Sequence, residues 1–400
     1  MAIRGQKAQA QTPGAQPHRL RLALGLLTVV IVVLAVSGYA LLSQKGTSSL
    51  DQSAVPTFNS LTIHSADTPL ASPPVISTAN PSSGAIRISL VGDVNLADGW
   101  GADLAHANGD SVAAAFSPDL LEHLQTADIF YANNEFTMSN QGTSLDKYYT
   151  FRADPARVVY WTQMGVDVVG LGNNHAYDYG EQAFLDTLTT LNSNNIKYVG
   201  AGTNLAEAMA PVCFTINGYT VAFVAADRSQ KGDEPRAQAA GEDTPGVLFC
   251  YDDELFLQAV ANARAEADYV IAIPHWGTEM STTLEPEQIE LAHKLIDAGA
   301  DAVVGSHPHI LQGMEFYQGK LIAYSLGNFW FNSVRTPTLI LDIEITDGQP
   351  HFKITPALQS GGSVLSSDEI SSEVLDLMRS LSPEVIINDD GSVTSLDAGA

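Results

Sequence analysis

Residues 303–331 read VVGSHPHILQGMEFYQGKLIAYSLGNFWF, and they contain two histidines, His307 and His309, separated by one proline. The pair follows an apolar run and a Gly-Ser turn, and a second apolar run, 320–326, comes after it. Two histidines at positions i and i+2 directly after a β-like run are typical of a strand end whose loop directs both imidazoles into one cleft. Neutral imidazole is the commonest protein metal ligand near neutral pH. On this stretch alone, a metal site and a pair of surface loop histidines are equally good interpretations.

Before this stretch, short apolar runs alternate with amphipathic segments. The apolar runs predict strands, which begin at Ile86 and recur at 128–134, 166–171, 196–200, 269–273 and 302–304. The amphipathic segments predict helices at 119–126, 155–164, 181–194, 254–267 and 286–298. Asn217-Gly218 separates the strand-like runs 213–216 and 219–225 and predicts a tight hairpin. This alternation predicts an α/β fold with mostly parallel strands.

After residue 320 the pattern changes. Runs 321–326, 338–345 and 352–356 predict consecutive antiparallel strands, and 367–381 predicts a final helix. The ending VIINDDGSVTSL fits either a further hairpin or a frayed tail. We therefore expect one large domain over 86–385, followed by an acidic C-terminal tail over 386–400.

The chain of 400 residues is strongly acidic, with 45 acidic and 19 basic residues and a formal net charge of −26. Such a surface repels nucleic acid and anionic lipid, so both are excluded as partners. An anionic substrate remains compatible with this charge if the site carries its own cations. Cys213 and Cys250 are the two cysteines, and the sequence fits a disulfide and two separate thiols equally well.

The N-terminal part predicts a membrane anchor. Residues 1–21 contain four basic residues and no acid, and residues 22–42, LALGLLTVVIVVLAVSGYALL, carry no charge. At 1.5 Å per residue this run would span about 30 Å. We expect a cytoplasmic N-terminus over 1–21, a single-pass signal anchor over 22–42, a Ser/Thr/Pro-rich linker over 43–85, and a domain outside the cell. A cleaved signal peptide is the alternative.

Polar side chains follow several predicted strands at the point where each strand ends, which is where ligands bind in α/β sheets. Each has a structural explanation when it is taken alone. Asp93 could cap a helix, Glu135 could be a solvated loop acid, and His275 could be packed in the core. All these explanations would have to hold together for the metal interpretation to fail.

The chemistry of these side chains favours a centre with two metal ions. The candidate ligands are two carboxylates, one amide and three imidazoles: Asp93, Glu135, Asn174, His275, His307 and His309. Mixed oxygen and nitrogen ligands suit Mn²⁺, Fe or Zn²⁺ better than Mg²⁺ or Ca²⁺. His175 could protonate a leaving group, and Asp178 could orient its imidazole. Motifs for a serine nucleophile, a P-loop, a dinucleotide fold or an H-E-x-x-H zinc site are absent.

The segments GDV (92–94), NNE (133–135), GNNHAYDYG (172–180), HWGTE (275–279) and 305–331 together resemble the CapA family of poly-γ-glutamate capsule synthesis proteins. The domain of this family is related to calcineurin-like metallophosphoesterases. The resemblance covers about 86–360 and implies a four-layer α/β/β/α sandwich, with a dinuclear metal site at the strand ends and the domain outside the cell.

The resemblance also implies a role for individual residues. Asp93 matches the aspartate of the first metal, Glu135 the bridging aspartate, and Asn174 and His175 the Asn-His pair, while His275, His307 and His309 match the remaining histidines. Two departures argue against simply assuming phosphatase activity: Asn95 replaces a histidine of the Asp-x-His motif, and Glu135 is longer than aspartate. Asn328, in the SLGNF run, is interpreted either as a strand end or as part of a substrate-contacting loop. The substrate-binding candidates are Asn95, Asn133, Glu279 and Asn328.

Three functions follow as hypotheses. The first is a dinuclear hydrolase or transferase that acts on γ-glutamyl or phosphoester bonds of the capsule polymer or another anionic substrate. The second is a non-catalytic component that binds the polymer during export or anchoring, together with membrane subunits of capsule synthesis. The third is a plain extracellular phosphodiesterase.

Overall fold

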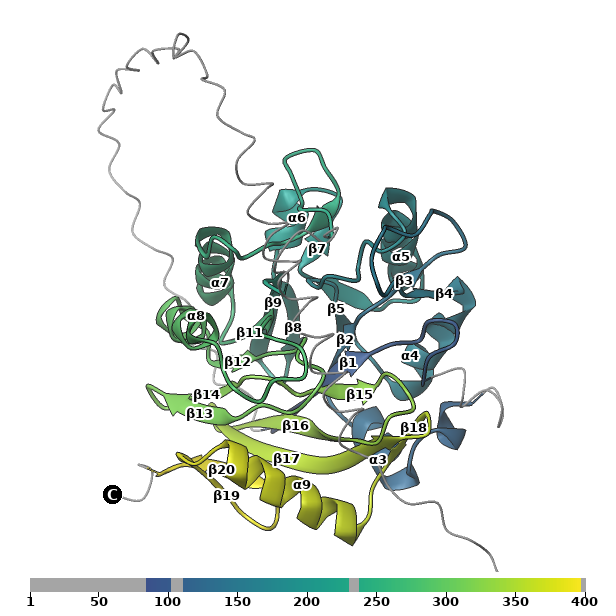
Figure 1. Ribbon diagram of the computed structural model, residues 1–400. Helices are drawn as coiled ribbons and strands as arrows, with labels where there is room; N and C mark the ends of the chain where they lie inside the picture. Colours follow the sequence, from purple (N-terminus) through teal and green to yellow (C-terminus); the bar gives the residue numbers. More distant parts are fainter. Residues whose placement is uncertain (1–83, 102–110, 230–236, 397–400) are drawn as a thin grey trace, which may run out of the picture. The chain divides into compact units, whose positions relative to one another are not determined.

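The computed structural model describes residues 84–101, 111–229 and 237–396, which form two large β-sheets with helices on their outer faces (Figure 1). The larger sheet has the strand order β19-β20-β17-β16-β1-β2-β5-β6, with β15 beside β1 and β18 beside β17. Its strands are β1 (Ile86–Val94), β2 (Ile129–Asn134), β5 (Val168–Gly170), β6 (Lys197–Val199), β15 (Asn328–Trp330), β16 (Thr336–Thr346), β17 (Gln349–Ser360), β18 (Ser363–Leu365), β19 (Val385–Ile387) and β20 (Ser392–Ser395).

The smaller sheet has the order β13-β14-β12-β11-β9-β8. Its strands are β8 (Val212–Ile216), β9 (Tyr219–Asp227), β11 (Tyr269–His275), β12 (Ala302–Val304), β13 (Met314–Tyr317) and β14 (Lys320–Ala323). Two short pairs complete the strands: β3 (Thr137–Met138) with β4 (Arg152–Ala153), and β7 (Ala201–Gly202) with β10 (Gly246–Val247).

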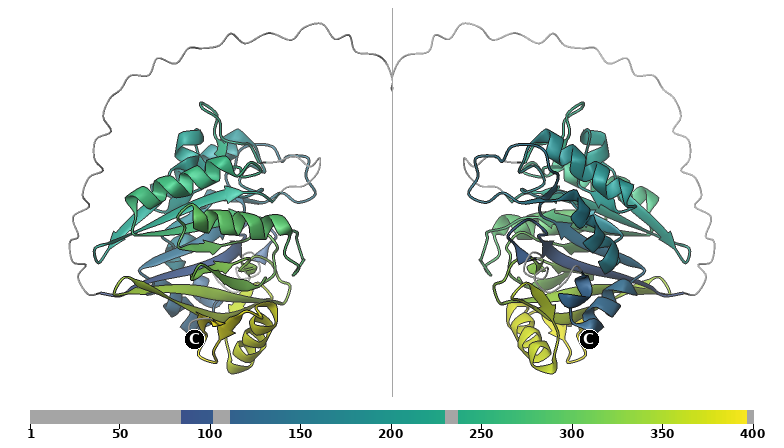
Figure 2. Two further views of the ribbon diagram at one scale, coloured as in Figure 1. Left: turned by 90° about the vertical axis from the view of Figure 1, so that its left-hand side faces the viewer. Right: turned by 90° about the vertical axis from the view of Figure 1, so that its right-hand side faces the viewer.

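Three hydrophobic cores define the layers of this domain. The first packs the outer face of the larger sheet against α3 (Pro118–Gln125), α4 (Val158–Met164) and α5 (Glu181–Ser193). The second lies between the two sheets, where Tyr131 stacks on Phe223 with ring centroids 6.0 Å apart, and it also includes α9 (Asp368–Leu381). The third packs the smaller sheet against α7 (Glu254–Glu266) and α8 (Pro286–Asp297), which Figure 2 shows side by side. The layers are therefore helix, sheet, sheet and helix.

The remaining helices of the described residues are short: α6 (Leu205–Met209) and the 3₁₀ turns η1 (Val112–Ala114) and η2 (Pro155–Arg157). Local sequence explains the boundaries of several elements. Helix α8 begins with a capping box in which the Glu285 and Gln288 side chains bind each other's backbone N–H groups, and Pro286 occupies its first turn. The hairpin between β8 and β9 turns at Asn217 and Gly218, both of which have positive φ, as their sequence predicts.

The carboxyl ends of the parallel strands lie together at one edge of each sheet. In the larger sheet β1, β2, β5 and β6 are parallel neighbours, and in the smaller sheet β9, β11, β12 and β14 are parallel. The backbone of Gly327 closes this edge, because Asp93 donates its N–H to the Gly327 carbonyl at 2.9 Å. A Cβ added at Gly92 would lie 1.9 Å from that carbonyl oxygen, so only glycine allows β15 to come this close to β1.

The α/β class is as predicted, but the predicted transmembrane helix in front of it needs correction. Within the described ranges, the structure contains no helix that is both long enough and apolar enough to cross a membrane. Residues 22–42, on which the prediction rested, lie outside the described residues, as do most of the predicted linker and the whole of 1–21. The structure supports the α/β class alone.

One further expectation is corrected within the domain. Residues 321–326 were expected to pair with 338–345, but β14 lies in the smaller sheet, antiparallel to β13 and parallel to β12. Of the two alternatives for the ending VIINDDGSVTSL, the structure has the hairpin: β19 and β20 pair with each other, and β20 pairs with β17. The two cysteines are separate thiols, of which Cys250 is buried and Cys213 is partly exposed.

Candidate metal centre

The strand ends of both sheets bring the six predicted ligands to one place. Asp93 is the penultimate residue of β1, Glu135 follows β2, and Asn174 lies in the loop after β5. His275 ends β11, and His307 and His309 lie in the loop after β12. All are buried except His309, whose side chain is 15% exposed. The larger sheet thus supplies the carboxylates and the amide, and the smaller sheet supplies the imidazoles.

Two groups of side chains could each hold a metal ion. One consists of Glu135, His275 and His307, the other of Asp93, Glu135 and His309, and within each group the ligand atoms lie within 4.8 Å of one another. Asn174 adds its amide oxygen, which lies 2.9 Å from His275 Nε2. Glu135 belongs to both groups, so its carboxylate could contribute to holding either ion.

The surroundings of the Glu135 carboxylate indicate whether these residues fit a metal ion. Its Oε1 is buried without a hydrogen bond to any described residue. It lies 3.9 Å from His175 Nε2 and 3.8 Å from the Nε2 atoms of His275 and His309. These separations are too long for hydrogen bonds, and a buried carboxylate oxygen without a partner is costly. A divalent cation bound to Oε1 would remove that cost, so the donor set fits a metal.

Burial shifts the pKa values of Glu135 and His275 in opposite directions. Burial raises the pKa of Glu135 well above its ordinary value, and the charge of Asp93 raises it further. Burial also lowers the pKa of His275 well below its ordinary value, and the neighbouring His307 and His309 add to this. The His275 ring is therefore neutral at physiological pH, which is the form that binds metals.

Hydrogen bonds orient the candidate ligands from behind. His275 Nδ1 lies 2.9 Å from Ser306 Oγ, and His309 Nδ1 lies 2.9 Å from Asn328 Oδ1. Asp93 Oδ1 accepts a hydrogen bond of 2.8 Å from the Asn133 amide. Such partners fix the tautomer and the direction of a ligand. Ser306 was not predicted from the sequence, although its place in GSHPH suggests it in retrospect.

The backbone of the histidine loop is strained. His307 and His309 have φ values of 100° and 60°, a region that non-glycine residues seldom occupy. The Pro308 carbonyl between them accepts the Met280 N–H at 2.9 Å, and the His307 N–H points to Asp93 Oδ2 at 3.3 Å. Backbone strain of this kind concentrates at functional sites, where surrounding contacts hold it in place.

His175 stands beside the two groups with its own support. Its Nδ1 lies 2.7 Å from Asp178 Oδ2, which leaves Nε2 directed at Glu135. The buried Asp178 also accepts hydrogen bonds from the Phe151 N–H at 2.8 Å and from Lys147 Nζ at 2.7 Å. Burial lowers the pKa of His175, while Asp178 counteracts this. His175 and Asp178 thus have the geometry expected of a proton donor and the group that orients it.

Lys147 is a second residue of the site that was not predicted from the sequence. Its side chain is 3% exposed, and besides Asp178 it binds the Asn174 carbonyl oxygen at 2.8 Å. It lies in the loop between β3 and β4, which follows neither a predicted strand end nor any periodic pattern. Proximity to Asp178 is visible only once the chain is folded.

The four predicted substrate-binding residues occupy different surroundings. Asn133 is buried and donates to Asp93, and Asn328 is buried against His309, so both support ligands. Asn95 is buried, and its Oδ1 accepts the Ala97 N–H at 2.9 Å. Glu279 is exposed, and its charge acts on Glu135 and His309. Glu279 is thus the one of these four that faces solvent.

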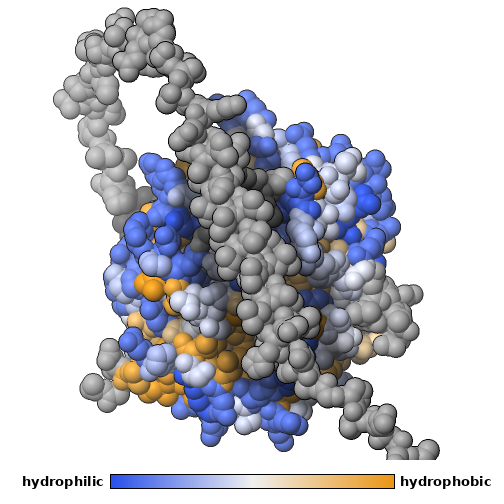
Figure 3. Space-filling view, in the orientation of Figure 1, coloured by the Kyte–Doolittle hydropathy of each residue, from blue (hydrophilic) through white to orange (hydrophobic). Residues whose placement is uncertain are grey.

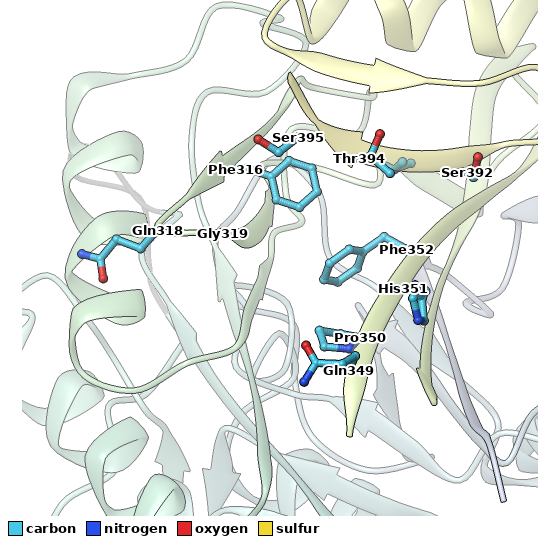
Figure 4. Close-up of a pocket in the computed structure, with 11 residues that line it drawn as sticks. Phe316, Gln318, Gly319, Gln349, Pro350, His351, Phe352, Ser392, Thr394 and Ser395 are labelled. Carbon is cyan, nitrogen blue, oxygen red and sulfur yellow. The ribbon is translucent and has the colours of Figure 1, made fainter. Parts of the chain in front are cut away.

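A separate cavity of about 610 Å³ lies at the opposite end of the strands (Figure 4). Phe316, Pro350 and Phe352 line it together with polar residues of β20. It lies near the start of β14 and near the turn between β16 and β17, and the end of β16 pairs with the start of β1. The candidate ligands, in contrast, lie at the ends of the parallel strands or in the loops that follow them. Apolar side chains gather over β13 and β14 nearby (Figure 3). None of the predicted site residues lines this cavity.

Comparison with known proteins gives a consistent family result. The model of the family described as "Bacterial capsule synthesis protein PGA_cap" matches residues 87–333, which include all six candidate ligands. The PGA biosynthesis protein CapA of Bacillus subtilis (strain 168) is 36% identical over 229 residues, which are 56% of this chain and 59% of that protein.

Two further relatives support the same match. The capsule biosynthesis protein CapA of Bacillus anthracis is 35% identical over 203 residues, 48% of this chain and 47% of that protein. A probable polyglutamine synthesis accessory protein of Mycobacterium tuberculosis is 32% identical over 217 residues, 52% of this chain and 57% of that protein. The chain spans about half of the length of these curated relatives.

Proposed function

The chain belongs to the bacterial capsule synthesis protein family PGA_cap, and from this premise we propose that it acts in poly-γ-glutamate capsule synthesis through a metal centre that contacts the polymer. The names of the two Bacillus relatives support the process, since both are described as capsule or PGA biosynthesis proteins. The capsule polymer is the proposed partner. Location outside the cell and association with other capsule-synthesis subunits stay predictions.

The observation that carries the metal proposal is the position of Glu135. Its buried Oε1 has imidazole nitrogens of His175, His275 and His309 around it at 3.8–3.9 Å, and it belongs to both candidate ligand groups. We propose two ions of Mn²⁺, Fe or Zn²⁺, held by Asp93, Glu135, Asn174, His275, His307 and His309. When bound, such ions supply Lewis-acid stabilisation and lower the pKa of a bound water.

The chain's own residues support hydrolysis or transfer at γ-glutamyl or phosphoester bonds. His175 keeps its Nδ1 on Asp178 and its Nε2 toward the ligand groups, so it can give a proton to a leaving group that lies there. Lys147 donates to Asp178 Oδ1 at 2.7 Å, and its Nζ also lies 3.5 Å from His175 Nδ1. Burial of all three side chains excludes bulk water from this path.

The test uses the full chain loaded with Mn²⁺ or Zn²⁺. Metal binding is measured by calorimetry, and turnover is measured on γ-glutamyl polymer and on p-nitrophenyl phosphate mono- and diesters. Metal-dependent cleavage or transfer of γ-glutamyl bonds is the expected result. The His307→Ala/His309→Ala variant should lose metal and turnover together, and His175→Ala should keep the metal and lose turnover.

Other outcomes separate the alternatives. Turnover of phosphate esters alone would favour the phosphodiesterase hypothesis. Metal-dependent polymer binding without turnover of any substrate would favour the non-catalytic role. Failure of the chain to bind either metal would overturn the metal centre, and unchanged capsule output in cells carrying His307→Ala/His309→Ala would remove the centre from the pathway.

A further inference from the structure

We propose that Trp100, Tyr148 and Tyr149, here called the aromatic rim, form a subsite that binds the uncharged backbone of a γ-glutamyl chain beside the metal centre. The inference rests on the proposed function and extends it from the reacting bond to the neighbouring residues of the polymer. Neither the sequence motifs nor the family match points to these three side chains.

Ring contacts connect the aromatic rim to the histidines of the centre. Trp100 lies 5.9 Å from Tyr149 between ring centroids, and Tyr149 lies 4.6 Å from Tyr148. Beneath them, Trp100 packs edge-on against Phe151 at 4.7 Å and against Phe331 at 5.8 Å. The continuous set of rings ends at the metal centre itself.

The two buried phenylalanines make that last contact. Phe151 lies 4.3 Å from the ring of His175, and Phe331 lies 4.8 Å from the ring of His309. His309 has the most exposed imidazole of the candidate ligands, so Phe331 lies on the open side of the centre. The aromatic rim therefore adjoins the side from which a substrate can enter.

The aromatic rim exposes apolar ring surface to solvent. Tyr148 is 83% exposed and Tyr149 is 51% exposed, although they are adjacent in sequence and touch each other. Trp100 is partly buried, whereas the other three tryptophans, Trp161, Trp276 and Trp330, are fully buried. Contiguous exposed aromatic surface beside a polar site is typical of a binding surface.

The segment that carries the tyrosines is held rigidly against the centre. Lys147 bridges the Asn174 carbonyl and Asp178, and Leu145 donates its N–H to the Asp178 carbonyl at 2.8 Å. Phe151 closes the segment with its N–H on the Asp178 carboxylate. Because the tyrosines are positioned before a ligand arrives, binding costs little conformational entropy.

Charge decides which part of the polymer these rings can bind. The chain carries a net charge of −26, which repels a polyanion. The basic side chains of the segment are engaged within the protein, Lys147 with Asp178 and Arg152 over the ring of Tyr179 at 4.4 Å. The polymer's carboxylates are therefore left to the metal centre and to solvent. What remains for the rim is the planar amide and the methylene groups of each γ-glutamyl unit, which stack well on aromatic faces.

The experiment measures equilibrium binding of a γ-glutamyl oligomer to the full chain loaded with Mn²⁺. Tyr148→Ala/Tyr149→Ala is compared with Tyr148→Phe/Tyr149→Phe, which keeps the rings and removes the hydroxyls. The alanine variant should bind about ten-fold more weakly and the phenylalanine variant about as tightly as the unmodified chain. Both should bind Mn²⁺ with unchanged affinity, which also reports that the centre has folded.

A second readout needs no variant. Because Trp100 is the tryptophan that is not fully buried, saturating oligomer should change the tryptophan fluorescence of the unmodified chain. A neutral dextran is included because aromatic faces also bind sugar rings.

The other outcomes would overturn the subsite, the substrate class or the proposed function, as follows. Equal oligomer affinity in the alanine variant, or no fluorescence change at saturation, would overturn the subsite and leave the proposed function standing. Tighter binding of dextran than of the oligomer would overturn the assigned substrate class. Failure of the Mn²⁺-loaded chain to bind the oligomer at all would overturn both proposals.

Discussion

At the scale of single residues, Glu135 is the side chain on which we expect metal binding to depend most, because it belongs to both candidate ligand groups. Glu135→Gln should weaken Mn²⁺ binding by about a hundred-fold or more, since the amide carries no charge and cannot bridge two ions.

The metal-free Glu135→Gln variant should nevertheless melt a few degrees higher than the metal-free parent at pH 8, because the buried carboxylate is no longer present. Calorimetric titration and thermal melts check the two effects. Parental Mn²⁺ affinity in the variant would contradict the role of Glu135.

The pKa shifts predict how metal binding depends on pH. Burial raises the pKa of Glu135, so the metal-free protein keeps a proton there at pH values where a solvated glutamate has lost it. Burial lowers the pKa of His309, but the hydrogen bond to Asp93, the charges of Asp93 and Glu279 and the hydrogen bond to Asn328 together outweigh this effect and raise the pKa overall. A metal must displace both protons, so affinity should fall as the pH falls from 8 to 6.

Proton release makes this prediction measurable. Titrations of Mn²⁺ into the chain in buffers of different ionisation enthalpy should show release of protons, and Glu135→Gln should release fewer. Equal affinity at pH 6 and pH 8 would contradict the prediction.

At the scale of elements, the loop between β3 and β4 and the loop after β5 are joined by one buried ion pair. Lys147→Met would leave Asp178 buried without its cation and should lower the free energy of unfolding by about 3 kcal/mol. Lys147→Met/Asp178→Asn removes both charges and should recover part of that loss. Urea unfolding of both variants and of Asp178→Asn alone completes the double-mutant cycle, in which additive effects would show that the pair is not coupled.

The approach of β15 to β1 makes a second prediction at this scale. A methyl group at Gly92 would collide with the Gly327 carbonyl, which is backbone and cannot rotate away. Gly92→Ala should cost about 3 kcal/mol and displace Asp93, weakening metal binding as well. Gly361→Ala is the matched control, because its positive φ of 61° costs about 1 kcal/mol although nothing lies within 4 Å. Equal stability of the two variants would contradict this account of the strand edge.

Strand ends are also where the sequence was most informative. Asp93, His275 and His307 were found because parallel strands end at one edge, a rule that needs no knowledge of the fold's details. Lys147 and Ser306 reach the site through contacts between loops, and local patterns contain no information about such contacts. The pairing partner of β14 was predicted wrongly because an apolar run predicts a strand without indicating the sheet to which it belongs.

At the scale of the whole domain, the candidate metal centre takes its ligands from both sheets. Asp93 and Glu135 come from the larger sheet, while His275, His307 and His309 come from the smaller one, so ions held among them connect both halves of the inner core. Metal bound only by the folded state should stabilise it by about 2.7 kcal/mol at a free concentration of 100 times Kd. The Tm of the Mn²⁺-loaded chain should therefore exceed that of the chelator-treated chain, and amide exchange should slow at the ends of β1, β2, β11 and β12 together.

His307→Ala/His309→Ala serves as the control and should show neither change. Protection confined to one sheet would mean that the ion is held within that sheet, and the account of a centre built across the interface would then be wrong.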